Sequence, residues 1–174
     1  MEQWYALGTA SGREEAAVSL LKDKIDHKFW NECRILKKIK VFRTRGKLRL
    51  LEDVMFHGYI LVNTDCPEKL IKELQKAKDF PQPLQAEEMI PLESADLSFL
   101  KSVCGEKLQK TMGITRILLN SDNKIIEADG VLDGYLNQIV KLNLHRRFAI
   151  VEVELFNRKQ DVLFGVQLER DLVG

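Results

Sequence analysis

The chain has 174 residues, of which 45% are apolar and 30% are charged, a composition typical of a globular protein with one ordinary domain or two small ones. Its 27 Lys and Arg residues nearly balance its 26 Asp and Glu residues, which excludes a generally polycationic protein, so any nucleic acid must be bound by local basic patches. No apolar run approaches the ~20 residues that cross a bilayer, and the start reads as a strand, so we expect a protein that is neither exported nor embedded in a membrane.

The first predicted elements are a strand and a helix. Residues 3–9 alternate in polarity and include an aromatic pair, which is typical of a strand. Ser11 followed three residues later by Glu14 is a capping-box pattern for the start of a helix. Apolar residues then recur at every fourth position across residues 13–29, which predicts a helix with one packing face.

Two strands are predicted, residues 33–41 and 55–62, and the first of them overlaps the longest like-charge block of the chain. From Cys33 to Leu51 there are eight Lys or Arg residues and no acid, and Gly46 suits the tip of a hairpin. Such a block either neutralises phosphates along a groove or keeps an exposed hairpin soluble. The sequence leaves open whether it touches RNA, non-template DNA or only water.

Two further helices complete the first half of the chain. One starts at Pro67 and is stopped by the prolines of residues 80–83. The other is capped by Ser94 and follows a short predicted edge strand at residues 86–90. For residues 1–105 this order of elements predicts an α/β sandwich, in which helices cover an antiparallel sheet.

After a predicted linker at residues 106–120, residues 121–174 show only strand-like patterns. Residues 140–144 and 151–155 alternate between apolar and polar side chains, as paired strands with one buried face do. Five short strands in about 50 residues can hide their edges only by curling into a barrel. The predicted fold class is therefore α+β, with an N-terminal sandwich and a small C-terminal β-barrel.

The turn between those two alternating segments concentrates positive charge, although the barrel segment as a whole holds more acidic than basic residues. Cations and hydrogen-bonding groups beside an aromatic ring suit the phosphates and unstacked bases of RNA loops. We predict an exposed RNA contact here, shared with basic residues of nearby turns; the alternative is an ordinary solvated hairpin tip. The predicted RNA-binding residues are Lys124, Lys141, Asn143, His145, Arg146, Arg147, Arg158 and Lys159.

The sequence indicates no enzyme, cofactor or metal site. His27, His57 and His145 lack the spacing of a metal site or a catalytic pair, and no P-loop, GxGxxG, GxSxG or HExxH motif occurs. The strand FHGYILV is apolar on both faces, so it is either buried on both sides or covered on one face by a partner. Three widely separated cysteines suit reduced packing residues of a cytoplasmic protein, namely Cys33, Cys66 and Cys104.

Three segments carry a family resemblance: WYALGTASGREEAAVSLL, VMFHGYILV and the tail ADGVLDGYLNQIVKLNLHRRFAIVEVELFNRKQDVLFGVQLE. They resemble, in that order, the opening strand and helix, the FFPGYVLV strand and the KOW domain of the NusG family of bacterial transcription elongation factors. The resemblance covers nearly the whole chain. It implies a non-enzymatic factor whose first domain binds the clamp helices of RNA polymerase and suppresses pausing, while a tethered KOW barrel recruits another partner.

By position in the resemblance, the polymerase contact would include Trp4, Tyr5, Phe56 and Tyr59. His57 stands where the family usually has proline, which leaves the backbone less constrained there. In the tail, DGVLDG lacks a common proline, and QDVLFG stands in place of the TPVEL run that follows LFGR in housekeeping members.

Together with the basic LHRR turn, these departures make the chain resemble LoaP. LoaP is a branch of processive antiterminators in Gram-positive bacteria that recognise a hairpin in a leader RNA. The segment PLQAEEMIPLESADLSFL and the ending RKQDVLFGVQLE also look like that branch. The expectation is a monomeric antiterminator of long operons. Two alternatives are a general elongation factor whose barrel binds proteins and a ribosome-associated KOW protein that binds RNA.

Overall fold

The computed structural model describes residues 3–81 and 89–172. The chain separates into two compact units and passes between them three times, because unit 1 comprises residues 1–36 and 56–99 and unit 2 comprises residues 37–55 and 100–174. No helix in the described ranges is long and apolar enough to span a membrane.

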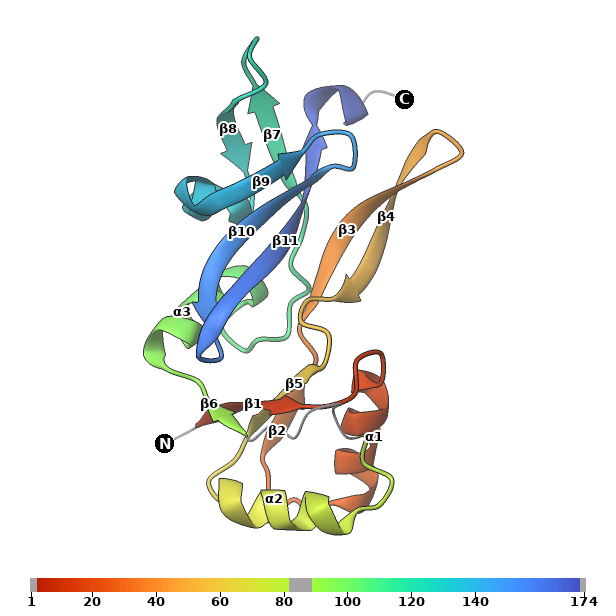
Figure 1. Cartoon of the computed structure of the whole chain (residues 1–174), viewed down its shortest axis with the longest axis vertical. Coiled ribbons are helices and arrows are strands. Elements are labelled where there is room, and N and C mark those ends of the chain that lie inside the picture. The colour runs from red at the N-terminus through yellow and green to blue at the C-terminus, as the bar shows by residue number, and fades with distance from the viewer. Residues whose placement is uncertain (1–2, 82–88, 173–174) are drawn as a thin grey trace. The chain divides into compact units, whose positions relative to one another are not determined.

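Unit 1 is built on a four-stranded antiparallel sheet in the order β2-β5-β1-β6. Two helices cover one face of this sheet (Figure 1), where their leucines share a core with Leu7, Ile60 and Val62. The strands are β1 (Trp4–Gly8), β2 (Glu32–Arg34), β5 (Tyr59–Asn63) and β6 (Ile90–Pro91), and the helices are α1 (Glu14–Lys24) and α2 (Pro67–Lys76). A third helix, α3 (Ser94–Cys104), contains the boundary between the units.

The start of α1 differs from the predicted capping box. No side chain caps the helix at Arg13; instead the carboxylate of Glu14 accepts hydrogen bonds from the backbone N–H groups of Gly12 and Gly58, each at 2.9 Å. Glu14 is only 3% exposed, so it fastens the start of the helix to the turn that precedes β5. The predicted edge strand appears as β6, although residues 86–88 of that prediction lie outside the described residues.

Unit 2 contains a curled five-stranded sheet in the order β8-β7-β11-β10-β9. All neighbours are antiparallel except β7 and β11, which pair in parallel, and Leu132, Phe156 and Phe164 are fully enclosed in its core. This arrangement confirms the α+β class with a barrel-like C-terminal part. The elements are β7 (Thr115–Leu119), β8 (Ile125–Asp129), η1 (Val131–Gln138), β9 (Ile139–Asn143), β10 (Phe148–Leu155), β11 (Arg158–Leu168) and η2 (Glu169–Leu172).

The basic block forms a separate hairpin of β3 (Lys37–Thr44) and β4 (Lys47–Val54) within unit 2. Arg45 and Gly46 both have positive φ, 51° and 76°, which confirms the predicted tip. The predicted strand at residues 33–41 is wrong as one element. It breaks after β2, because its first residues pair with β5 whereas its later residues pair with β4.

Candidate nucleic-acid interface

The turn between β9 and β10 is pre-organised by its own residues. Asn143 accepts a hydrogen bond at its Oδ1 from the backbone N–H of Arg146 at 2.9 Å, so that oxygen is already used inside the turn. His145 and Arg146 are exposed at its tip. Lys141 is also exposed, and its Nζ lies 5.8 Å from the centre of the Phe148 ring. The turn therefore presents three cationic or titratable side chains to solvent.

Arg147 is placed differently from its neighbour, and the expectation that both arginines of the turn are exposed is wrong. The side chain of Arg147 is 5% exposed and pairs with Asp171, with Nε to Oδ2 at 2.8 Å and Nη2 to Oδ1 at 2.9 Å. Its Nη1 also donates to the carbonyl of Leu144. This hydrogen bonding raises the pKa of Arg147 and lowers the pKa of Asp171. Arg147 therefore holds the turn against η2.

The remaining predicted RNA-binding residues do not form one cluster. Arg158 and Lys159 follow β10, whereas the basic turn precedes it, and a strand of eight residues separates its ends by about 23 Å. Lys159 also lies 3.7 Å from Glu152. Lys124 is exposed in the turn between β7 and β8, next to Asn123. Of the predicted RNA-binding residues, Lys141, Asn143, His145 and Arg146 therefore lie together at the β9–β10 turn. Arg158 and Lys159 lie away from them, at the other end of β10.

A groove of about 640 Å³ lies beside the β9–β10 turn in unit 2. Its cationic lining comes from Arg43 of β3, Arg147, and Arg170 of η2, and His145 adds a titratable ring. Among the described residues that line it, Glu169 is the only acidic one, and the apolar ones are Ile117, Leu118, Leu119, Leu144 and Leu168. A groove of this kind can hold phosphates at its rim and a base against its apolar floor. Neither Arg43 nor Arg170 was among the predicted site residues; only the open question about the basic block pointed toward Arg43.

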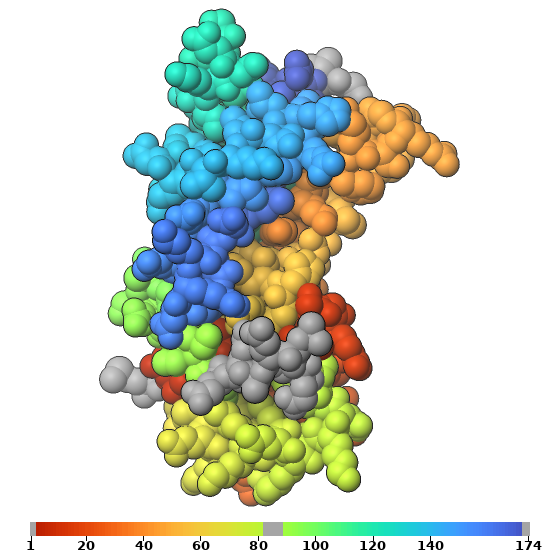
Figure 2. All heavy atoms as spheres, in the orientation of Figure 1, coloured from red at the N-terminus to blue at the C-terminus, as the bar shows by residue number. Residues whose placement is uncertain are grey.

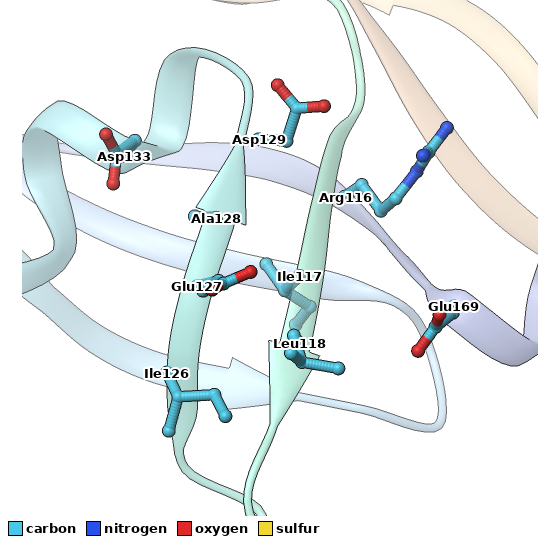
Figure 3. A pocket seen from close by; sticks show the side chains of 9 residues that line it. All are labelled: Arg116, Ile117, Leu118, Ile126, Glu127, Ala128, Asp129, Asp133 and Glu169. Atoms are coloured by element: carbon cyan, nitrogen blue, oxygen red, sulfur yellow. The ribbon is translucent and has the colours of Figure 1, made fainter.

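A second pocket in unit 2, of about 450 Å³, has the opposite character. Figure 3 shows carboxylates from β8, from the start of η1 and from η2 around it, with one arginine from β7. Repulsion between these carboxylates and phosphates makes this pocket unsuitable for nucleic acid. The polar lining residues are Arg116, Glu127, Asp129, Asp133 and Glu169.

The predicted polymerase-binding residues lie in unit 1 and are mostly enclosed. Trp4, Phe56 and Tyr59 are 6%, 7% and 9% exposed, respectively. Strand alternation separates Trp4 from Tyr5, because Tyr5 pairs with Val62 of the helix-covered face, whereas Trp4 and Tyr59 belong to the opposite face. The structure therefore does not place Trp4 and Tyr5 on one surface.

Among the residues that the structure describes, no group of three His, Cys, Asp or Glu side chains could hold a metal.

The family model described as transcription termination factor nusG matches residues 2–101. Eleven chains of solved structures match. One of them, described as "Domain interaction in Thermotoga maritima NusG", is 14% identical with a TM-score of 0.48, over 95% of this chain and 94% of that chain. No curated protein matches the sequence.

Proposed function

Since the chain belongs to the NusG family of RNA polymerase-binding transcription elongation factors, we propose that it is a processive antiterminator of the LoaP kind. Residues 1–105 would bind the clamp helices of the polymerase, and the barrel of residues 121–174 would bind a hairpin in a leader RNA. The protein would act as a cytoplasmic monomer without a cofactor. The observation that carries the RNA part of this proposal is the groove lined by Arg43, His145 and Arg170 beside the exposed Arg146.

Replacing Arg146 with alanine should weaken binding of a structured leader RNA by about tenfold, because a charged hydrogen bond contributes about 1.5 kcal/mol. The slope of log affinity against log salt should also fall by about one. Fluorescence anisotropy across a salt series, with a panel of structured leader RNAs, measures both quantities.

Arg158→Ala is the matched control, because it removes the same charge from an exposed site at the far end of β10. We expect it to leave the affinity nearly unchanged. Equal losses for the two variants would indicate attraction by overall charge, and an unchanged affinity for Arg146→Ala would remove the turn from the site.

The polymerase contact can be tested with two buried phenylalanines of unit 1. Phe56 is 7% exposed and Phe80 is 5% exposed, but Phe80 belongs to the helix-covered core. Phe56 is buried in the free protein, so it can contact the polymerase only if binding exposes it. We expect Phe56→Ala to lose co-purification with RNA polymerase and Phe80→Ala to keep it, once both are compared at equal folded fraction. Wild-type protein that does not bind polymerase would support the ribosome-associated alternative.

One observation favours a second candidate, a general elongation factor whose barrel binds proteins. Ile126 and Val140 are large apolar side chains in unit 2 that are 56% and 58% exposed, and exposed apolar residues can mark protein interfaces. This candidate predicts that no structured RNA binds tightly at physiological salt.

A further inference from the structure

The β3–β4 hairpin is fixed to the barrel by its backbone. The N–H of Ile39 donates to the carbonyl of Met112, and the N–H of Met112 donates to the carbonyl of Lys37, both at 2.8 Å. Thr111 adds a hydrogen bond to Glu52 at 3.1 Å. The root of the hairpin is therefore held by the segment that leads into β7.

Gly165 of β11 permits this close approach. A Cβ atom at this position would lie 2.8 Å from the carbonyl oxygen of Ile39, 3.3 Å from the Cα of Lys40 and 2.5 Å from Cδ1 of Ile114. No side chain other than hydrogen fits without displacing the hairpin backbone. Figure 1 shows β3 running beside β11 at this place.

The charges of the hairpin divide between its root and its tip. Near the root, Lys37 pairs with Glu52 at 3.4 Å and Lys40 pairs with Asp53 at 3.0 Å, so these cations are already compensated. Burial lowers the pKa of Lys38 between them. Toward the tip, among the residues that the structure describes, no acid pairs with Arg43, Arg45, Lys47 or Arg49.

Arg43 connects this uncompensated half of the hairpin to the basic turn. Its Nη2 donates to the backbone carbonyl of His145 at 3.2 Å, and both residues line the groove. Figure 2 shows the hairpin in orange beside the blue β9–β10 turn, with the hairpin tip projecting outward. Arg43 still has other guanidinium N–H groups with which to bind a phosphate.

We propose that the hairpin is the second wall of the RNA site, and that Arg43 binds a backbone phosphate of the same RNA that contacts Arg146. This inference rests on the proposed RNA-binding function. The barrel turn supplies one side of a composite groove, Arg170 of η2 lies in it, and the docked hairpin supplies the opposite side. RNA binding then depends on residues about 100 positions apart in the sequence being held together by the Gly165 contact.

The test compares Arg43→Ala with Arg49→Ala in the full chain. Arg49 pairs with Phe42, the neighbour of Arg43, so its side chain lies on the opposite face of the hairpin while carrying the same charge. With the tightest-binding leader-RNA stem-loop as probe, we expect Arg43→Ala to lower affinity about tenfold and the salt slope by about one. Arg49→Ala should change both only slightly.

Gly165→Ala tests whether docking is required. With the hairpin displaced, Arg43→Ala should cause little further loss, so the two substitutions should be strongly non-additive. Full additivity, or equal effects of Arg43 and Arg49, would overturn the inference. If Gly165→Ala fails to fold, the comparison of Arg43→Ala with Arg49→Ala still tests whether Arg43 contacts the RNA.

These outcomes separate the inference from the proposed function. Loss of affinity with Arg146→Ala but not with Arg43→Ala overturns the composite site and leaves RNA binding by the barrel intact. Wild-type protein that binds none of the structured RNAs overturns both.

Discussion

Replacing Arg147 with alanine should lower the free energy of unfolding of unit 2 by about 3 kcal/mol, whereas the same change at Arg146 should cost about 0.5 kcal/mol or less. The two residues are adjacent and carry the same charge, but only Arg147 is buried and paired. Its removal leaves the carboxylate of Asp171, 8% exposed, without its cationic partner, although the backbone N–H of Leu168 still donates to it. It also takes a donor from the carbonyl of Leu144.

Urea denaturation followed by far-UV circular dichroism measures this difference. Both tryptophans, Trp4 and Trp30, lie in unit 1, so tryptophan fluorescence reports separately on that unit and should change little. The double variant Arg147→Ala with Asp171→Ala should recover part of the loss, because no unpaired buried charge remains. Equal destabilisation by Arg146→Ala would mean that the ion pair does not hold the turn.

A second large effect is expected at Gly130, where alanine should destabilise unit 2 by about 3 kcal/mol through strain and overpacking together. Gly130 has φ of 143°, a conformation that side chains disfavour. An added Cβ would lie 2.6 Å from Oγ1 and 2.8 Å from Cα of Thr115. That hydroxyl accepts the N–H of Leu132 at 3.1 Å, so the clash also disturbs the start of η1.

Gly134 is the matched control for this prediction. It lies four residues later, inside η1, and an added Cβ there would meet nothing within 4 Å. We expect Gly134→Ala to change stability by about 0.5 kcal/mol or less. Thermal unfolding of both variants decides, and similar midpoints would show that the contact between Gly130 and Thr115 relaxes without cost.

Local patterns predicted the elements of the fold well, because each depends on nearby residues. The alternation on either side of the β9–β10 turn and the glycine at the hairpin tip both appear as expected. The partners of the strands could not be predicted in the same way. Nothing in residues 33–41 indicates that Cys33 pairs with β5 while Ile39 bonds to Met112, since pairing is decided by distant segments.

The candidate site shows the same limit for single residues. Arg146 and Arg147 are identical in type, and only the positive φ of Arg147, 57°, and its distant partner Asp171 distinguish an exposed cation from a buried one. By contrast, the separation of Trp4 from Tyr5 follows from the two-residue period of any strand. The sequence alone contained that information.

Because the chain passes three times between its units, recombination between related genes can separate segments that contact each other in unit 2. A single recombination joint within α3 would exchange residues 100–174 with those of a relative but leave the β3–β4 hairpin behind. The two members of each contacting pair, Gly165 with Ile39 and Arg43 with His145, would then come from different parent proteins. We therefore expect the sequences of the hairpin and the barrel to covary among relatives, although two separate stretches of the gene encode them.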